Sequence, residues 1–152
     1  MNSPAKKVLA TATDFDLWCA VAQSVFDRWQ AAGKESLNEV QRIAWAVWAA
    51  SGVIGNRGFF NHTSEEMAEW SNAYDALGIT EAAAAIRDAA RIMPSINFSS
   101  NDPTERLLDD IERRYYAADE QTARAVAALI RARATDAFAG LKLESKAKGV
   151  SR

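Results

Sequence analysis

The sequence has few of the residues that interrupt helices or cross-link a chain: its 152 residues include three prolines, seven glycines and one cysteine. A lone thiol, Cys19, cannot form an internal disulfide, which is typical of a reducing compartment. The longest nearly apolar stretch, from Ile43 to Ile54, is shorter than the roughly 20 residues that span a bilayer. Lys6 and Lys7 precede only a brief apolar run, so no secretory signal is expected. These absences predict a cytoplasmic protein that does not use a membrane as its partner.

Sequence motifs of enzymes and metal sites are also missing, including nucleotide-binding loops, nucleophile elbows and zinc-ligand spacings. The single histidine, His62, has no nucleophile motif beside it, which favours a role in a turn or a helix cap. Asp109, Asp110 and Glu112 crowd one helix without the histidine, cysteine or glycine loop of known metal sites. We therefore expect no catalytic residue, no metal and no cofactor. The alternative is an enzyme or small-ligand site near His62 and Asn56.

The residues that are present favour helices. Hydrophobic residues make up 49% of the chain and charged residues 25%, which is ordinary for a globular domain. Alanine is frequent, and β-branched residues never alternate as they do in a half-buried strand. A chain of this length can bury one core. The sequence predicts an all-α, single-domain bundle of about six helices over residues 13–143, with a flexible N-terminus at 1–12 and a basic tail at 144–152.

Local signals predict where the helices begin. Thr13 can cap the first helix, which is expected to end near Gly33. Two pairs of residues have the spacing of a capping box, in which each side chain satisfies a free backbone N–H. These pairs are Ser36 with Glu39 and Thr63 with Glu66. Later helices are expected to start at three residues: Thr80, Asp102 and Asp119.

The segment between the second and third predicted helices is rich in glycine and aromatic residues. Gly55, Asn56 and Gly58 all tolerate positive φ angles, and Phe59 follows them directly. We therefore expect a glycine turn, pinned by aromatic side chains, after the second helix.

Charge is distributed unevenly along the chain. Residues 1–57 hold six basic and five acidic residues, residues 58–120 hold five and thirteen, and residues 121–152 hold seven and two. The net charges are +1, −8 and +5, which give −2 for the whole chain. A negative central segment can attract a basic protein surface, although a solvated helix face gives the same pattern. The candidate partner-binding residues are Glu65, Glu66, Glu69, Asp109, Asp110 and Glu112.

Three segments resemble one known family. They are Gly52 to Phe59, Ala73 to Pro94 around Gly78, and Leu108 to Asp119. Together they are similar to the helical DNA-mimic-protein family, otherwise classified as a domain of unknown function, over about residues 36–131. Arg57 stands where the family's turn usually has a second glycine, and the net charge of −2 is weaker than that of a DNA-like surface. The resemblance implies an all-helical fold and a protein partner, without identifying that partner.

Together, these features predict a non-catalytic interaction module that covers a basic surface of another protein, as an inhibitor or immunity-type protein does. A DNA-mimic regulator of a DNA-binding protein is the alternative that the resemblance implies. Direct nucleic-acid binding is not expected, because the basic residues gather near the C-terminus without stacking aromatics. A homodimer through Trp45 and Trp48 is a further alternative. Trp48 or Trp70 could also anchor a partner, although their helical spacing favours burial in the core.

Overall fold

A computed structural model describes residues 1–59, 62–96 and 103–143. These ranges hold eight α-helices, two short 3-10 helices and no strand, so the all-α prediction is confirmed. The elements are α1 (Ser3–Thr11), α2 (Asp14–Ala32), η1 (Lys34–Ser36), α3 (Glu39–Arg57), α4 (Ser64–Ala76), α5 (Thr80–Ile92), η2 (Met93–Ser95), α6 (Pro103–Asp119), α7 (Thr122–Ala132) and α8 (Ala134–Ala137). The predicted number of about six helices is too low, because α1 forms and the last predicted helix is divided into α7 and α8.

Helix α1 occupies the segment for which a flexible N-terminus is predicted. The Asn2 side chain caps this helix by accepting a hydrogen bond of 3.0 Å from the backbone N–H of Ala5. Pro4 lies in the first turn, where proline is favoured, and Ala5 is buried in the core. An asparagine cap and an early proline are therefore the start signals that the sequence prediction overlooks.

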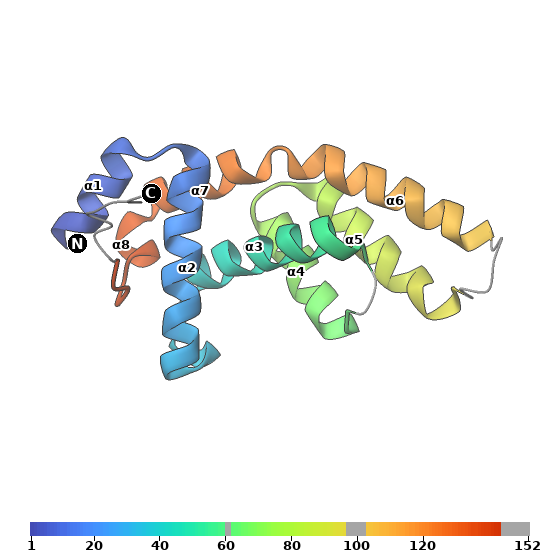
Figure 1. Cartoon of the computed structure of the whole chain (residues 1–152), viewed down its shortest axis with the longest axis horizontal. Coiled ribbons are helices and arrows are strands. Elements are labelled where there is room, and N and C mark those ends of the chain that lie inside the picture. Colours follow the sequence, from blue (N-terminus) through green and yellow to red (C-terminus); the bar gives the residue numbers. More distant parts are fainter. Residues whose placement is uncertain (60–61, 97–102, 144–152) are drawn as a thin grey trace, which may run out of the picture.

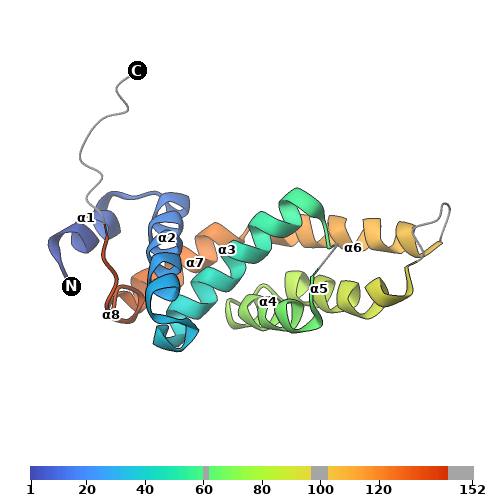
Figure 2. The same ribbon diagram turned by 60° about the horizontal axis from the view of Figure 1, so that its bottom comes forward.

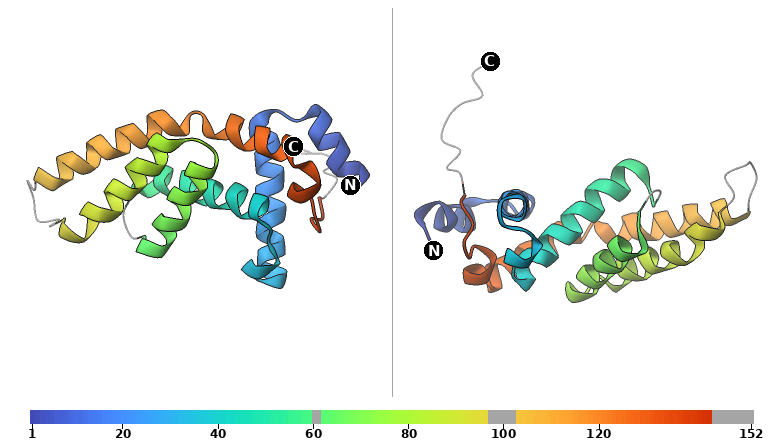
Figure 3. Two further views of the ribbon diagram at one scale, coloured as in Figure 1. Left: turned by 180° about the vertical axis from the view of Figure 1, so that it is seen from behind. Right: turned by 90° about the horizontal axis from the view of Figure 1, so that it is seen from below.

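The molecule is elongated, and α6 and α7 follow one another along one of its long edges (Figure 1). At one end, α2 stands across the long axis and packs against α3 and α7, while α1 and α8 lie beyond it (Figures 1 and 2). In the other half, α5 packs against both α4 and α6 (Figure 3). Helix α3 contacts α2, α4 and α7, so it connects the two halves.

A cluster of buried polar groups holds α3, α4, α6 and α7 together. The Asp119 carboxylate accepts hydrogen bonds from the hydroxyls of Tyr74 at 2.7 Å, Ser51 at 2.8 Å and Thr122 at 2.7 Å. The hydroxyls of Tyr74 and Tyr115 lie 2.8 Å apart. Burial is the main cause of the raised pKa of both tyrosines, which therefore stay protonated at pH values where an exposed tyrosine ionises. Asp119 therefore joins these helices. Its predicted role as the cap of the last helix is wrong, because Asp119 is the last residue of α6, and Gln121, which precedes α7, makes no side-chain cap.

Two of the predicted side-chain caps are confirmed. Thr13 caps α2 by accepting from the backbone N–H of Asp16 at 3.1 Å, and α2 ends at Gly33, whose φ is 79°. Thr63 and Glu66 form the predicted capping box at the start of α4, with bonds of 2.9 Å and 3.1 Å. These signals depend only on residues three apart in the chain.

The predicted capping box of Ser36 and Glu39 is wrong. The box at the start of α3 is formed by Asn38 and Gln41. Ser36 lies in η1 instead, where its hydroxyl donates to the carbonyl of Gly33 at 2.7 Å. The capping box of α3 is therefore formed by the side-chain amides of Asn38 and Gln41, two residues later along the chain than predicted.

The starts of α5 and α6 lie close to their predicted positions. Gly78, with φ of 74°, follows α4, and α5 begins at Thr80 as predicted. Helix α6 begins at Pro103, and its predicted cap, Asp102, lies outside the described residues.

The predicted glycine turn begins later than the sequence indicates. Helix α3 continues through Gly55 and Asn56, and the positive φ is taken up by Gly58 at 62°. This extension buries Ile54 completely, which outweighs the cost of about 1 kcal/mol for glycine in a helix. Phe59 is fully buried and packs edge-on against the Tyr115 ring, with centroids 5.7 Å apart. The remainder of the predicted turn includes residues 60–61, outside the described residues.

Candidate protein-binding surfaces

The six predicted partner-binding acids lie on two helices. Three are on α4 and three on α6, and α5 packs against both helices. The α4 residues are Glu65, Glu66 and Glu69, and the α6 residues are Asp109, Asp110 and Glu112. Each group therefore has its own neighbours and is described separately below.

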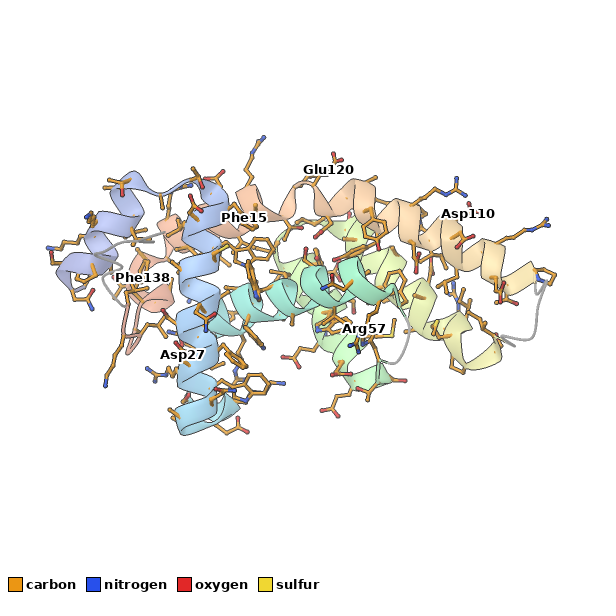
Figure 4. The ribbon with its side chains drawn as sticks, viewed as in Figure 1. Phe15, Asp27, Arg57, Asp110, Glu120 and Phe138 are labelled. Carbon is orange, nitrogen blue, oxygen red and sulfur yellow. The ribbon has the colours of Figure 1, made fainter. Side chains whose placement is uncertain are left out.

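One side of α6 carries a row of carboxylates. A helix turns by about 100° per residue, which places Glu105, Asp109 and Glu112 within about 60° of one another around the axis of α6, and Glu120 follows in the turn directly after the helix. None of these four acids forms an ion pair in the described part of the chain. Figure 4 shows Glu120 pointing away from the ribbon. We call these four residues the acidic edge; they extend over about 22 Å, from the first turn of α6 to the residue after its end.

Contacts with the end of α3 hold the acidic edge in place. The Tyr116 hydroxyl donates to the carbonyl of Ile54 at 2.9 Å, and the backbone N–H of Phe59 donates to Glu112. Partial burial raises the pKa of Glu112, and repulsion from Asp109 adds to this, while the bond from Phe59 opposes it. The Asp109 and Glu112 charges therefore interact, and a cation between them would relieve their repulsion.

Other acids of the negative central segment are neutralised by arginines. Asp110 forms an ion pair with Arg113, one helical turn later. On the neighbouring helix, Arg114 reaches from α6 to Asp88 at 2.8 Å and to Glu81 at 3.7 Å. Asp110 is therefore a weaker candidate than the sequence indicates.

Sequence reasoning omits two members of the acidic edge, Glu105 and Glu120. Their spacing from Asp109 and Glu112, in steps of three, four and eight residues, is the signal that could have identified them. Counting charges along the chain hides this periodicity.

The three acids of α4 line a groove between that helix and the region around η1 and α3. Glu69 forms an ion pair with Lys34 at 2.6 Å, and Glu66 completes the capping box with Thr63. Glu65 is exposed and forms no ion pair in the described ranges. The groove has a volume of about 390 Å³. We call it the tryptophan groove, because Trp29, Trp45 and Trp70 line it.

The tryptophans differ in their exposure. Trp70 is buried, in agreement with its predicted core position. Trp48 is half-buried and meets the Trp18 ring edge-on at 5.2 Å. Trp45 is half-buried as well, and it stacks on Phe26 with ring centroids 5.0 Å apart. Both side chains proposed for a homodimer contact thus already pack against α2.

The structure gives little support to the alternative of a small-ligand site near His62. The His62 ring packs edge-on against Trp70, with centroids 4.9 Å apart, and its buried Nε2 has no hydrogen-bond partner among the described residues. The Asn56 amide donates to the carbonyl of Gly52 at 2.7 Å. Neither residue lines the tryptophan groove. In the described ranges no three His, Cys, Asp or Glu side chains are grouped to hold a metal ion, and no helix is long and apolar enough to cross a membrane.

Comparison with known families gives one match. Residues 35–133 match the family model described as DMP19-like protein, which covers most of the chain. The chain belongs to this family. DMP19-like proteins are a DNA-mimic family, so the resemblance inferred from the sequence is confirmed. No curated protein and no solved structure matches the chain.

The two surfaces relate differently to the DMP19-like region. The whole acidic edge lies within the matched residues, as do its contacts with the end of α3. The tryptophan groove, in contrast, also uses Trp29 and Lys34, which precede the matched residues. Helix α2 and η1 thus complete a surface that the DMP19-like region alone does not contain.

Proposed function

We propose that this DMP19-like protein binds a basic surface of another protein through its acidic edge and thereby blocks that surface, without catalysing a reaction. The observation that carries the proposal is the acidic edge itself, whose four carboxylates have no cationic partner in the described chain. A row of unpaired like charges favours a basic partner and speeds its approach. The packing of His62 on Trp70 supports a structural role for the one histidine.

Membership of a DNA-mimic family favours a second candidate, in which the blocked surface is the DNA-binding site of the partner. One strand of duplex DNA carries a phosphate about every 3.4 Å along the axis, or six to seven over about 22 Å. The acidic edge offers four carboxylates over that length, with Arg106 and Arg113 on the adjoining side of the helix. It therefore has roughly 60% of the charge of one strand over the same length.

The test begins with a partner captured from an extract of the native host and identified. Its affinity is then measured for the wild-type chain, for the double variant Asp109→Asn with Glu120→Gln, and for a control variant. The control, Asp16→Asn with Asp27→Asn, removes the same charge from exposed positions on α2. We expect the edge variant to bind about tenfold more weakly or worse, and the control to bind like the wild type, because close charge pairs across interfaces contribute substantially. Equal binding by all three proteins would remove the basis of the proposal.

Duplex DNA as a competitor separates the two candidates. If the partner binds DNA and the duplex displaces the protein from it, the DNA-mimic function is supported. If the complex depends on the acidic edge but resists duplex DNA, the blocked surface is another basic site. Both complexes are expected to weaken as salt rises, since exposed charges are screened.

A further inference from the structure

The tryptophan groove has the size and shape of a binding site for side chains. Its volume of about 390 Å³ joins a neighbouring depression of about 620 Å³, and the two share Lys34, Arg42, Ala46, Glu65 and Glu69. Most residues that line the two depressions come from α3 and α4. Ligand sites usually have volumes of about 300–1,000 Å³, so each depression is large enough for a side chain of another protein.

The floor of the groove presents aromatic rings. One face of the Trp45 ring stacks on Phe26. The ring centroids of Trp29 and Trp45 are 5.7 Å apart, and Trp29 is 37% exposed. The faces of tryptophan rings attract cations, with an energy that grows as the site excludes water. An accessible tryptophan in a groove is therefore suited to a flat cationic group.

The charges on the rim favour a cation too. Both basic residues of the rim are already occupied, Lys34 by Glu69 at 2.6 Å and Arg42 by Glu35 at 3.7 Å. Glu65 has no ion pair in the described residues. Glu66, the other lining acid, bonds to the start of its own helix through Thr63, which also lowers its pKa and keeps it ionised at neutral pH. The charge left over in the groove is therefore negative.

We propose that the tryptophan groove binds an arginine side chain of a partner protein, with the guanidinium on Trp29 and hydrogen-bonded to Glu65. Arginine fits better than lysine, because a planar guanidinium stacks on an aromatic face and donates two parallel bonds to a carboxylate. This site goes beyond the proposed function: it lies on α4 rather than on the acidic edge, and Trp29 and Lys34 precede the DMP19-like region.

The test uses the full chain labelled with ¹⁵N and follows the indole N–H signals of its five tryptophans during titration. The probe is N-acetyl-arginine methylamide; the comparison compounds are the citrulline derivative, which is neutral and has nearly the same shape, and the lysine and leucine derivatives. We expect saturable shifts of Trp29, Trp45 and Trp70. Trp18, whose indole N–H donates to the carbonyl of Ala44 at 3.0 Å, and Trp48 should stay unchanged as internal references.

Discrimination between the probes and a matched pair of variants decides the result. The citrulline derivative should bind about fivefold more weakly or worse, because it keeps the shape and loses the charge. Glu65→Gln should weaken arginine binding to a similar degree, whereas Asp109→Asn on the acidic edge should leave it unchanged. Equal binding of lysine or leucine, equal shifts of all five tryptophans, or unaltered binding by Glu65→Gln would overturn the proposal. Since the probe is a single blocked arginine that does not need the acidic edge, failure here leaves the acidic edge to be judged by its own experiment.

Discussion

Replacing Asp119 should destabilise the whole fold, because its carboxylate accepts hydrogen bonds from the hydroxyls of three other residues. Tyr74 comes from α4, Ser51 from α3 and Thr122 from the start of α7. Alanine at position 119 removes all three acceptor bonds at once. The junction of four helices would then lose its central hydrogen-bonding group.

The size of the effect follows from which donors water can reach. Tyr74 and Thr122 are buried, whereas Ser51 is only partly buried and can bond to water instead. Hydrogen bonds to charged groups contribute about 1.5–3 kcal/mol each, so the two bonds from buried donors correspond to about 3–6 kcal/mol. Tyr74 keeps its contact with the Tyr115 hydroxyl, which lowers the expected loss to about 3–5 kcal/mol. Domains of this size are stable by only about 5–15 kcal/mol.

Urea unfolding followed by far-ultraviolet circular dichroism measures this loss. Asp119→Asn should cost less, about 1–2 kcal/mol, because Tyr74 and Thr122 both donate to the same oxygen, Oδ1, which asparagine keeps. Glu120→Ala is the control, since this exposed neighbour makes no ion pair in the described chain and should change stability by about 0.5 kcal/mol or less. The reasoning is refuted if Asp119→Ala is no more destabilising than Glu120→Ala.

Three further results are expected. Because burial raises the pKa of Tyr74 and Tyr115, the unfolded chain releases these protons near the ordinary value of 10 while the folded chain keeps them. The free energy of unfolding should therefore fall as pH rises above 10. In the folded protein, the exposed Tyr116 should ionise first and give the early tyrosinate absorbance. Ionisation of all three tyrosines at the same pH would contradict this. Thr63→Ala removes the cap of α4 and should cost about 1 kcal/mol, whereas Thr63→Ser should restore most of it in urea melts. Gly78→Ala forces a side chain into a positive φ of 74° and should cost about 1–2 kcal/mol in the same assay, unlike alanine at an exposed helical site.

Helix starts could be predicted where one local signal has no competitor, and could not where two signals overlap. Ser36 with Glu39 and Asn38 with Gln41 have the same spacing, two residues apart. The structure selects the second pair through remote contacts: the Asn38 amide donates to the carbonyl of Asp136 at 2.8 Å, and the Gln41 amide donates to the same short helix region. These partners lie more than 90 residues away along the chain, beyond any local signal.

The candidate site could also be predicted only where local signals in the sequence determine it. The negative central segment is visible in the sequence, and the pair of Asp110 with Arg113 could be recognised from its spacing. The pair of Glu69 with Lys34 joins residues 35 positions apart, so it depends on how α4 packs beside η1. Which carboxylates stay free is decided by such contacts between helices.

Helix α6 extends from the hydrogen-bonded junction at Asp119 and packs against α5. Its 17 residues are about 25 Å long, so a tilt of about 5° at the junction would move the far tip at Pro103 by about 2 Å. Displacements of that size alter the distance between a carboxylate and an arginine enough to make or break their contact. The hydroxyls that bond to Asp119 and the packing of α5 on α6 therefore together set the precision with which the row of charges, some 20 Å away at its far end, can be matched to a partner.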